Sequence, residues 1–309
     1  MKPLVYIVML NWNGIEETLE SLESLRSLRY PNYEVVLVDN GSDNNEGDKI
    51  KEVYPEIHLI KNDKNLGFAE GCNIGMRHAI GKGADYILLL NNDTSVDPDF
   101  IDILADFSEN NKKTAVVSPK IYYYDSDKIW FNGAKLHIWA GLFKHIDNGR
   151  TDKEAQVKQP TSVETASGCA FFIRTSALKD IGLLYSPYFA YYEEADWSFR
   201  ARRAGYDVMV VPESKIWHKV SAATGKKGEN TLSPFQAYFF GRNPRIFAER
   251  NLSGLKKLLF VLAYYTSSLI YNISRCQSND AIKKYFKGMR DGRNILKNKK
   301  WQIKKEITK

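Results

Sequence analysis

Polar and acidic side chains follow directly after an apolar run in the first third of the chain. Tyr86 to Leu90 are apolar without a break, and Asn91, Asn92 and Asp93 come next. An unbroken run of this kind is typical of a strand buried on both faces of a parallel sheet. A carboxylate at the carboxyl end of such a strand suits a divalent cation that shares its shell with a substrate phosphate. A solvated turn is the alternative interpretation.

A second acidic group, Glu193, Glu194 and Asp196, lies where a loop is predicted to lead into a helix. The helix dipole favours such acids by about 0.3–1 kcal/mol each, and capping would account for one of them, such as Glu193. Crowded carboxylates also raise one another's pKa, which can produce a general base near neutral pH. His218 ends a later strand, and a lone histidine is most often structural. Beside a carboxylate, however, an imidazole is a suitable ligand for Mn²⁺.

Two further segments have the composition of a nucleotide site. Asp39 ends the second predicted strand, and Asp43 follows four residues later. An acid at this place in a doubly wound fold can bind the two hydroxyls of a ribose, although capping of the next helix is an alternative. The segment from Asn65 through Gly67 to Asn73 offers small residues where the backbone can approach a diphosphate or a base. Its glycines recur every four residues, which suits close helix packing equally well.

Strand-like and helix-like patterns alternate over the first 120 residues. Strands are predicted at 4–10, 34–38, 57–61, 86–90 and 115–118, with helices over about 15–28, 46–54 and 98–110. The glycine-rich segment 62–75 is predicted to lead into a further helix that reaches about 81. This alternation predicts an α/β fold with a mostly parallel, Rossmann-like sheet flanked by helices. The aromatic-rich segment 122–147 predicts a small antiparallel ribbon, and strands follow at 171–174 and 208–211.

Charge is distributed unevenly along the chain. Residues 234–309 carry 17 Lys/Arg against 4 Asp/Glu, a balance of +13, which leaves −6 on residues 1–233 within the total of +7. A basic tail indicates an anionic partner such as lipid headgroups or nucleic acid, and the acidic body makes nucleic acid the poorest choice.

The three scattered cysteines argue against a disulfide framework or a zinc site and suggest a reducing compartment. The first apolar run stops at Asn11, as a strand does, so we predict no signal peptide.

The tail itself is predicted to be helical. Residues 234–251 have a helical pattern, and the uncharged stretch 258–274 follows. Seventeen residues span about 25 Å as a helix, less than the ~30 Å hydrocarbon core, so an interfacial helix fits better than a transmembrane one. Residues 283–309 add 11 basic side chains that suit anionic lipid. A helical bundle packed on the preceding domain, with a solvated basic face, is the alternative.

Seven blocks together resemble the inverting glycosyltransferases of family 2, which have the GT-A fold. The similarity is greatest to the rhamnosyltransferase-like branch that builds bacterial surface polysaccharide. The matching blocks span residues 4 to about 220 in family order. They are Asn11-Trp-Asn-Gly14, Val38-Asp-Asn-Gly-Ser-Asp43, Asn65-Leu-Gly-Phe-Ala69 with Asn73, Asn91-Asn-Asp-Thr94, Ser167-Gly168, Glu193-Glu-Ala-Asp196 and Trp217-His218.

The resemblance implies a role for each matching residue. Glu194 falls where the family places its catalytic base, with Glu193 as the competing candidate because the family usually has Asp there. Asp93 is similar to the last acid of the family's DxD motif, and His218 is its expected co-ligand for Mn²⁺ or Mg²⁺. The first acid of that motif is replaced by Asn91, which should weaken metal affinity. Asp196 is expected to orient the base or to bind an acceptor hydroxyl. The expected donor-binding residues are Asn11, Asp39, Asp43, Asn65, Gly67, Asn73, Asn92 and Asp93.

The implied function is metal-dependent, inverting transfer of a sugar from a nucleoside-diphosphate donor to a glycan or lipid-linked glycan acceptor. The expected donor is L-rhamnose linked to dTDP or UDP. An NAD-type oxidoreductase is disfavoured, because no GxGxxG motif follows the first strand. The alternative is a catalytically weak sugar-nucleotide-binding or scaffold protein. We expect a catalytic domain over 1–233, with a nucleotide-binding half (1–120) and an acceptor half (121–233), and a basic helical region over 234–309. We also expect a cytoplasmic protein, peripheral on the inner face of the cell membrane, with no nucleic-acid partner.

Overall fold

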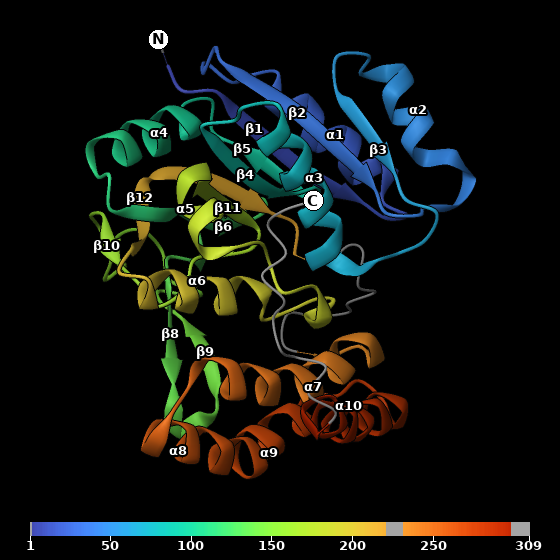
Figure 1. Cartoon of the computed structure of the whole chain (residues 1–309), viewed down its shortest axis with the longest axis vertical. Helices are drawn as coiled ribbons and strands as arrows, with labels where there is room; N and C mark the ends of the chain where they lie inside the picture. Colours follow the sequence, from blue (N-terminus) through green and yellow to red (C-terminus); the bar gives the residue numbers. More distant parts are fainter. Residues whose placement is uncertain (1, 221–230, 298–309) are drawn as a thin grey trace.

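The computed structural model describes residues 2–220 and 231–297, and a ten-stranded sheet lies at its centre (Figure 1). The main path through the sheet runs β10-β12-β6-β11-β4-β1-β2-β3, while β5 pairs with β12 and β7 with β6. The strands are β1 (Val5–Asn11), β2 (Tyr33–Asp39), β3 (His58–Lys61), β4 (Tyr86–Asn91), β5 (Thr94–Val96), β6 (Thr114–Tyr123), β7 (Ile129–Phe131), β10 (Thr161–Ser162), β11 (Ala170–Arg174) and β12 (Asp207–His218).

The predicted mostly parallel sheet is confirmed. Strands β3, β2, β1 and β4 are parallel neighbours, and β12 runs parallel to β6. Between these two groups lies β11, which is antiparallel to both β4 and β6. The apolar run of β4 is buried throughout, because helices cover both faces of the sheet.

Six helices cover the sheet, three on each face. One core contains apolar side chains of α1 (Ile15–Leu25), α2 (Glu46–Val53) and α4 (Phe100–Asn110). The other contains side chains of α3 (Gly67–Gly81), α5 (Thr175–Ile181) and α6 (Glu193–Arg203). In α3, a Cβ on Gly71 or Gly75 would lie 2.4 or 2.3 Å from the side chains of Leu10 or Val8. These two glycines therefore serve close packing of α3 on β1.

The predicted antiparallel ribbon is also present. It consists of β8 (Ala134–His137) and β9 (Leu142–His145), joined by the short helix η2 (Ile138–Ala140). The hairpin extends from the sheet toward the tail, where Ser267 donates a hydrogen bond to the Trp139 carbonyl (Figure 1).

The tail forms four helices, α7 (Pro234–Asn251), α8 (Gly254–Tyr265), α9 (Ser267–Ser274) and α10 (Asn279–Lys297). The predicted helix over 234–251 is confirmed, and it begins at a capping box between Ser233 and Gln236. The predicted single helix over 258–274 is wrong, because Thr266 leaves helical geometry at φ −123° and ψ −94°. The Thr266 hydroxyl donates a hydrogen bond to the Leu262 carbonyl at 2.8 Å. Hydroxyl bonds of this kind, to a carbonyl four residues earlier, slightly destabilise a helix and often bend it.

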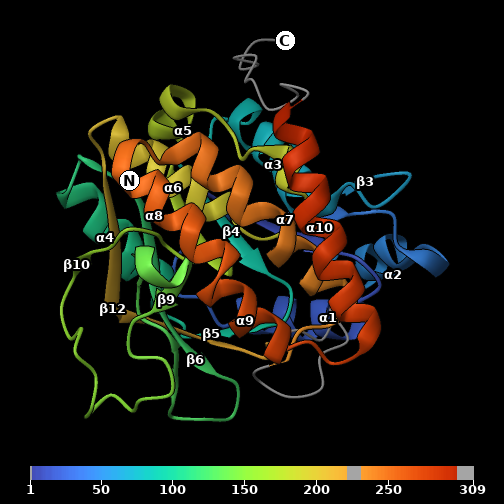
Figure 2. The ribbon, with the colours of Figure 1, turned by 90° about the horizontal axis from the view of Figure 1, so that it is seen from below.

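The tail packs against the rest of the chain. Phe247 and Phe260 share a buried cluster with Tyr188 and Tyr192 from the segment before α6, and α10 packs on α7 around Tyr285. Among the described residues no helix is both long and apolar enough to cross a bilayer. The predicted basic stretch 283–309 lies partly outside the described residues. Seen from below, α8, α9 and α10 share one face of the molecule (Figure 2).

Candidate active site

The carboxyl ends of the central strands bring the first group of site residues to one edge of the sheet. In the register of the parallel strands, Asn11 lies opposite Asp39 and Leu10 opposite Asn91. The antiparallel strand β11 begins at the same edge, where Ala170 pairs with Leu90. The turn that precedes β11 therefore lies beside the end of β4.

Asp93 and His218 meet at this edge. Strand β5 folds back beside β12, so that Thr94 pairs with His218. Oδ1 of Asp93 lies 3.0 Å from Nε2 of His218, and the two residues are only 8% and 5% exposed. Burial alone would lower the pKa of His218, but Cys169 and Asp93 together hold that pKa well above its ordinary value. The buried ion pair differs from the solvated turn that was the alternative for this segment.

The turn Ser167–Cys169 connects this pair to the second acidic group. The Cys169 carbonyl accepts a hydrogen bond from the Asn91 amide at 2.9 Å, and the same residue interacts with His218. A Cβ on Gly168 would lie 3.6 Å from Cβ and Cγ of Glu194. One three-residue turn thus lies beside both Glu194 and the Asp93–His218 pair.

Glu193 and Glu194 begin α6 in different surroundings. Glu194 is partly exposed, and burial raises its pKa from 4.5 to about 7, against the opposing effect of backbone amides of Glu194, Ala195 and Tyr192. Glu193 is buried, and burial together with the charge of Glu194 raises its pKa well above the ordinary value. Of the two, Glu194 has the access and the proton affinity of a base near neutral pH.

Asp196 is enclosed by its own hydrogen-bonding partners. Its side chain is fully buried and is contacted by four partners: Arg200 at 2.8 Å, Arg250 at 2.7 Å, Asn251 at 2.8 Å and the Tyr188 hydroxyl at 3.3 Å. Burial alone would raise the pKa of Asp196, but Arg200 and Arg250 lower it to about 2. Asp196 therefore joins α6 to α7, and these partners leave its carboxylate little access to an acceptor hydroxyl, whereas the expectation that it orients the base stays a prediction.

The first donor-binding candidates lie together at the ends of β1 and β2. Asn11 is fully buried, and its amide donates to Ser42 Oγ at 3.0 Å and to Glu46 Oε2 at 2.9 Å. Asp39 accepts a hydrogen bond from the Ser42 amide at 3.2 Å. The exposed Asp43 is hydrogen bonded to Asn13 at the beginning of α1. The capping alternative does not explain this group, because Ser42 makes no side-chain cap hydrogen bond to the short helix that follows it and Asp43 lies inside that helix.

The remaining candidates differ in what they contact. Asn65 accepts hydrogen bonds from Asn40 at 3.1 Å and from the Gly67 amide at 2.8 Å, which fixes this loop beside the end of β2. Asn92 donates to Thr18 Oγ1 at 2.8 Å. Asn73 lies apart from them: its amide both donates to and accepts from the backbone of Leu184, at 2.9 and 3.0 Å. This geometry assigns Asn73 to holding the segment after α5.

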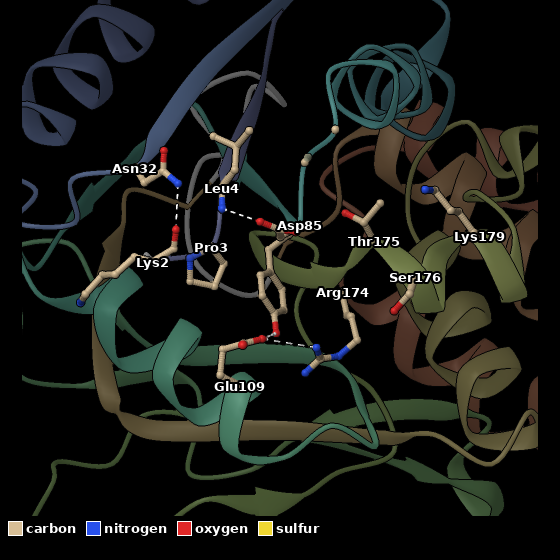
Figure 3. A pocket seen from close by; sticks show the side chains of 13 residues that line it. Lys2, Pro3, Leu4, Asn32, Asp85, Glu109, Arg174, Thr175, Ser176 and Lys179 are labelled. Carbon is tan, nitrogen blue, oxygen red and sulfur yellow. Dashed lines mark hydrogen bonds and ion pairs between the residues drawn. The ribbon is translucent and has the colours of Figure 1, made fainter.

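A pocket of about 820 Å³ lies at the other edge of the sheet, at the amino ends of β1 and β4 (Figure 3). Asp85, Glu109, Arg174 and Lys179 contribute charged side chains to its wall. None of the predicted site residues lines it, so we distinguish this pocket from the candidate active site.

Once His218 has lost its proton, the Asp93–His218 pair has a geometry that suits a divalent cation. Two donors in adjacent positions around an ion, each at about 2.1 Å, are about 3 Å apart. Within the described residues no group of three or more His, Cys, Asp or Glu side chains could hold a metal. The other ligands would therefore have to come from water and from a bound diphosphate, as is usual for cations at phosphate-transfer sites.

The fold and the comparisons with known proteins define the class. The fold is of the GT-A type, and a solved structure with this fold, that of GalNAc-T7 with UDP, GalNAc and Mn²⁺, aligns with a TM-score of 0.60 at 18% identity. That alignment covers 88% of this chain and 57% of the other. The protein is a glycosyltransferase.

The sequence comparisons identify the family. Residues 6–182 match the model of Glycosyl transferase family 2, and the chain belongs to this family. It is similar to the dTDP-rhamnosyl transferase RfbF of Shigella flexneri, at 27% identity over 86% of this chain and 88% of the relative. It is also similar to the N-acetylglucosaminyl-diphospho-decaprenol L-rhamnosyltransferase of Mycobacterium tuberculosis, at 25% identity over 64% of this chain and 70% of the relative.

Sequence reasoning missed several residues that shape the site. No role was expected for Asn40, although it lies within a matching block. Its side chain accepts a hydrogen bond from the Leu66 amide and donates one to Asn65 Oδ1. Arg250 and Asn251 lie 54 and 55 residues after Asp196, and no sequence pattern links them to that carboxylate.

Proposed function

We propose that this protein is a metal-dependent, inverting glycosyltransferase that uses Glu194 as its base. The observation that supports this proposal is the position of the turn Ser167–Cys169, which lies beside both Glu194 and the Asp93–His218 pair. We propose that the reacting sugar lies against this turn, within reach of both the base and the diphosphate-binding group.

The proposed reaction is a single in-line displacement. Glu194 takes the proton of an acceptor hydroxyl while that oxygen forms a bond to the anomeric carbon, and the bond from this carbon to the diphosphate oxygen breaks. The nucleoside diphosphate leaves with the electron pair, so the anomeric configuration inverts and one base suffices. A Mn²⁺ or Mg²⁺ ion held by Asp93 and His218 would supply positive charge for the departing diphosphate.

We propose dTDP-L-rhamnose as the donor, with UDP-sugars as the rival class. The names of the two relatives, a dTDP-rhamnosyl transferase and an L-rhamnosyltransferase that acts on a decaprenol-linked sugar, support rhamnose and a lipid-linked or glycan acceptor in surface polysaccharide synthesis. For the nucleotide we propose contacts with Asp39, Asp43 and the Asn65–Gly67 loop. Asn11 and Asn92 would act mainly by fixing this edge, because their amides already bind protein groups.

The experiment that tests this function measures donor binding and turnover separately. We expect dTDP-L-rhamnose to raise the melting temperature of the wild type in the presence of Mn²⁺. Asp93→Ala should lose this shift, whereas Glu194→Gln should keep it and lose turnover. Asp97→Ala, a change of the same kind four residues later, is the control and should keep both properties. A protein that binds the donor and never turns it over would instead be the catalytically weak binding protein.

We further propose that the tail places the enzyme on an anionic membrane at the inner face of the cell. The exposed apolar residues of α8 recur along one side of the helix: Leu255, Leu258 and Leu262 are 69%, 55% and 54% exposed. Ile270 of α9 and Trp139 at the hairpin tip are 71% and 72% exposed. Helix α10 lies on the same face of the molecule as α8 and α9 (Figure 2), and anionic headgroups would neutralise its exposed Lys283, Lys284, Lys287 and Arg290. This surface would bring the enzyme to a lipid-linked acceptor.

A further inference from the structure

The loop that precedes the acidic start of α6 has an unusual backbone. Phe189, Tyr191 and Tyr192 have φ angles of 66°, 66° and 78°. Non-glycine residues rarely adopt positive φ, and they keep it only where the surroundings impose it. Three such residues immediately before Glu193 and Glu194 require a specific set of contacts that holds them.

Asn243 of α7 supplies part of that set. Its side chain is fully buried, and its Nδ2 donates to the carbonyls of Ala190 and Tyr191, both at 2.7 Å, with a longer contact of 3.2 Å to the carbonyl of Tyr188. One amide therefore contacts three carbonyls of a single loop, which fixes their relative directions.

Arg242 extends this contact. Its Nη2 donates to the carbonyls of Pro187 and Tyr188 at 2.7 and 2.5 Å, and its Nε donates to Oδ1 of Asn243 at 2.9 Å. The guanidinium is 8% exposed and lies over the ring of Phe239, 4.8 Å from its centroid. Two neighbouring side chains of α7 thus hold the loop and brace each other.

Helix α3 holds the same loop through its N-terminus. The Ala69 amide donates to the carbonyl of Phe189 at 3.1 Å. Gly67 has φ +84°, and a Cβ there would lie 2.6 Å from this carbonyl oxygen and from the Phe189 ring, so only glycine allows the contact. The loop is therefore fixed both by α7 and by the segment that begins at Asn65, which is part of the proposed nucleotide site.

Each backbone carbonyl from Pro187 to Tyr192 has a partner. Those of residues 187–191 bind α7 or α3, and that of Tyr192 accepts from the Asp196 amide at 2.9 Å, within the first turn of α6. The loop thus helps to set the position of that first turn, and hence the direction of Glu194, together with the bonds of Arg250 and Asn251 to Asp196. Because Arg250 joins α7 to Asp196 independently at 2.7 Å, loss of the contacts from Asn243 leaves α7 attached.

We propose that Asn243 and Arg242 are positioning residues for the reaction: they hold residues 187–192 in the strained conformation that directs Glu194 toward the turn Ser167–Cys169. This inference rests on the proposed role of Glu194 as the base. It makes the tail helix a necessary part of the active-site architecture, separate from any contact of the tail with membrane. A relaxed loop would displace the base, whereas Asn65 and Gly67 of the donor site would keep their own hydrogen bonds from Asn40.

The test compares Asn243→Ala with Asn272→Ala in the full chain. Asn272 is a matched control because it is also buried, at 3% exposed, and donates within the tail to Ser268 Oγ at 3.1 Å. With dTDP-L-rhamnose, Mn²⁺ and water as the acceptor of the sugar, we expect Asn243→Ala to lower kcat for release of dTDP by about 10²-fold, with the donor dissociation constant unchanged. Asn272→Ala should keep the kcat of the wild type. Equal kcat values for the two variants would overturn the inference.

A second measurement does not depend on turnover. Hydrogen–deuterium exchange should be faster in peptides covering 187–196 of Asn243→Ala than in those of Asn272→Ala, and unchanged exchange would overturn the inference. Should Asn243→Ala not fold, Arg242→Lys serves the same test, because it keeps the charge but loses the bond to Asn243 Oδ1. A wild type without turnover would instead count against the proposed function, while the exchange measurement would still decide whether Asn243 sets the loop.

Discussion

The change Glu194→Gln should affect stability and activity in opposite directions. The variant keeps the size of the side chain but removes the charge. In the folded protein, burial raises the pKa of Glu194 from 4.5 to about 7. The folded state therefore binds a proton more tightly than the unfolded state does, and this difference makes stability depend on pH.

The sign and size follow from the two pKa values. Below pH 4.5 the carboxyl is neutral in both states, and its full contribution to stability is present. As pH rises from 4.5 to about 7, the unfolded state loses the proton first, so the free energy of unfolding falls. A shift of this size corresponds to about 3 kcal/mol, which is an upper limit because the side chain is partly exposed and solvent screens it.

The assay is urea denaturation of the wild type and Glu194→Gln between pH 4.5 and 8.5. We expect the wild type to lose stability relative to the variant up to about pH 7 and the difference to stay constant above it. In the same pH range kcat/KM of the wild type should rise, with an inflection at about pH 7, because the base must be deprotonated.

Glu193→Gln is the matched control, since it makes the same change one residue earlier. It should retain turnover, whereas Glu194→Gln should lose roughly 10²–10⁴-fold in kcat. Parallel stability curves for the wild type and Glu194→Gln, together with a kcat/KM that does not change around pH 7, would refute the reasoning. Retained turnover in Glu194→Gln and lost turnover in Glu193→Gln would transfer the base to Glu193.

Two further predictions concern the tail. Arg250→Met removes one partner of the buried Asp196 and should lower the free energy of unfolding, measured by urea denaturation, by about 3–5 kcal/mol. Arg245→Met is the control, because the pair of Arg245 with Glu249 is longer, at 3.9 Å. It should lower the free energy of unfolding far less. For membrane binding, we expect the full chain to sediment with vesicles of phosphatidylglycerol and not of phosphatidylcholine, and Leu258→Ser with Leu262→Ser should weaken this. Val53→Ser, on α2 and 54% exposed, is the control, and full-length protein that stays in the supernatant would contradict the membrane proposal.

Local sequence determined the regular elements of the catalytic half. The apolar run of Tyr86 to Leu90 predicted a central strand, because a strand covered on both faces has no exposed side to alternate with. The pattern of 234–251 likewise predicted α7 with its observed bounds. The helix over 258–274 breaks at Thr266, whose hydroxyl bonds to the Leu262 carbonyl, and the composition of this uncharged stretch did not indicate the break.

The division into a catalytic domain over 1–233 and a tail over 234–309 stays a prediction, as do the roles of the individual site residues. The structure adds contacts that cross position 233. Arg250 and Asn251 bind Asp196, and Asn243 binds the loop before it. A separate unit over 1–233 would lack these contacts.

The sequence by itself determined which residue types stand at the ends of the strands, and therefore the class of chemistry. Hydrophobic periodicity is a local property, so it predicted the sheet and placed Asp93 at a strand end without knowledge of the fold. Only the tertiary structure decided which acids of the group Glu193, Glu194 and Asp196 remain available. That outcome depends on burial and on charges contributed by residues more than 50 positions away, which no local pattern encodes.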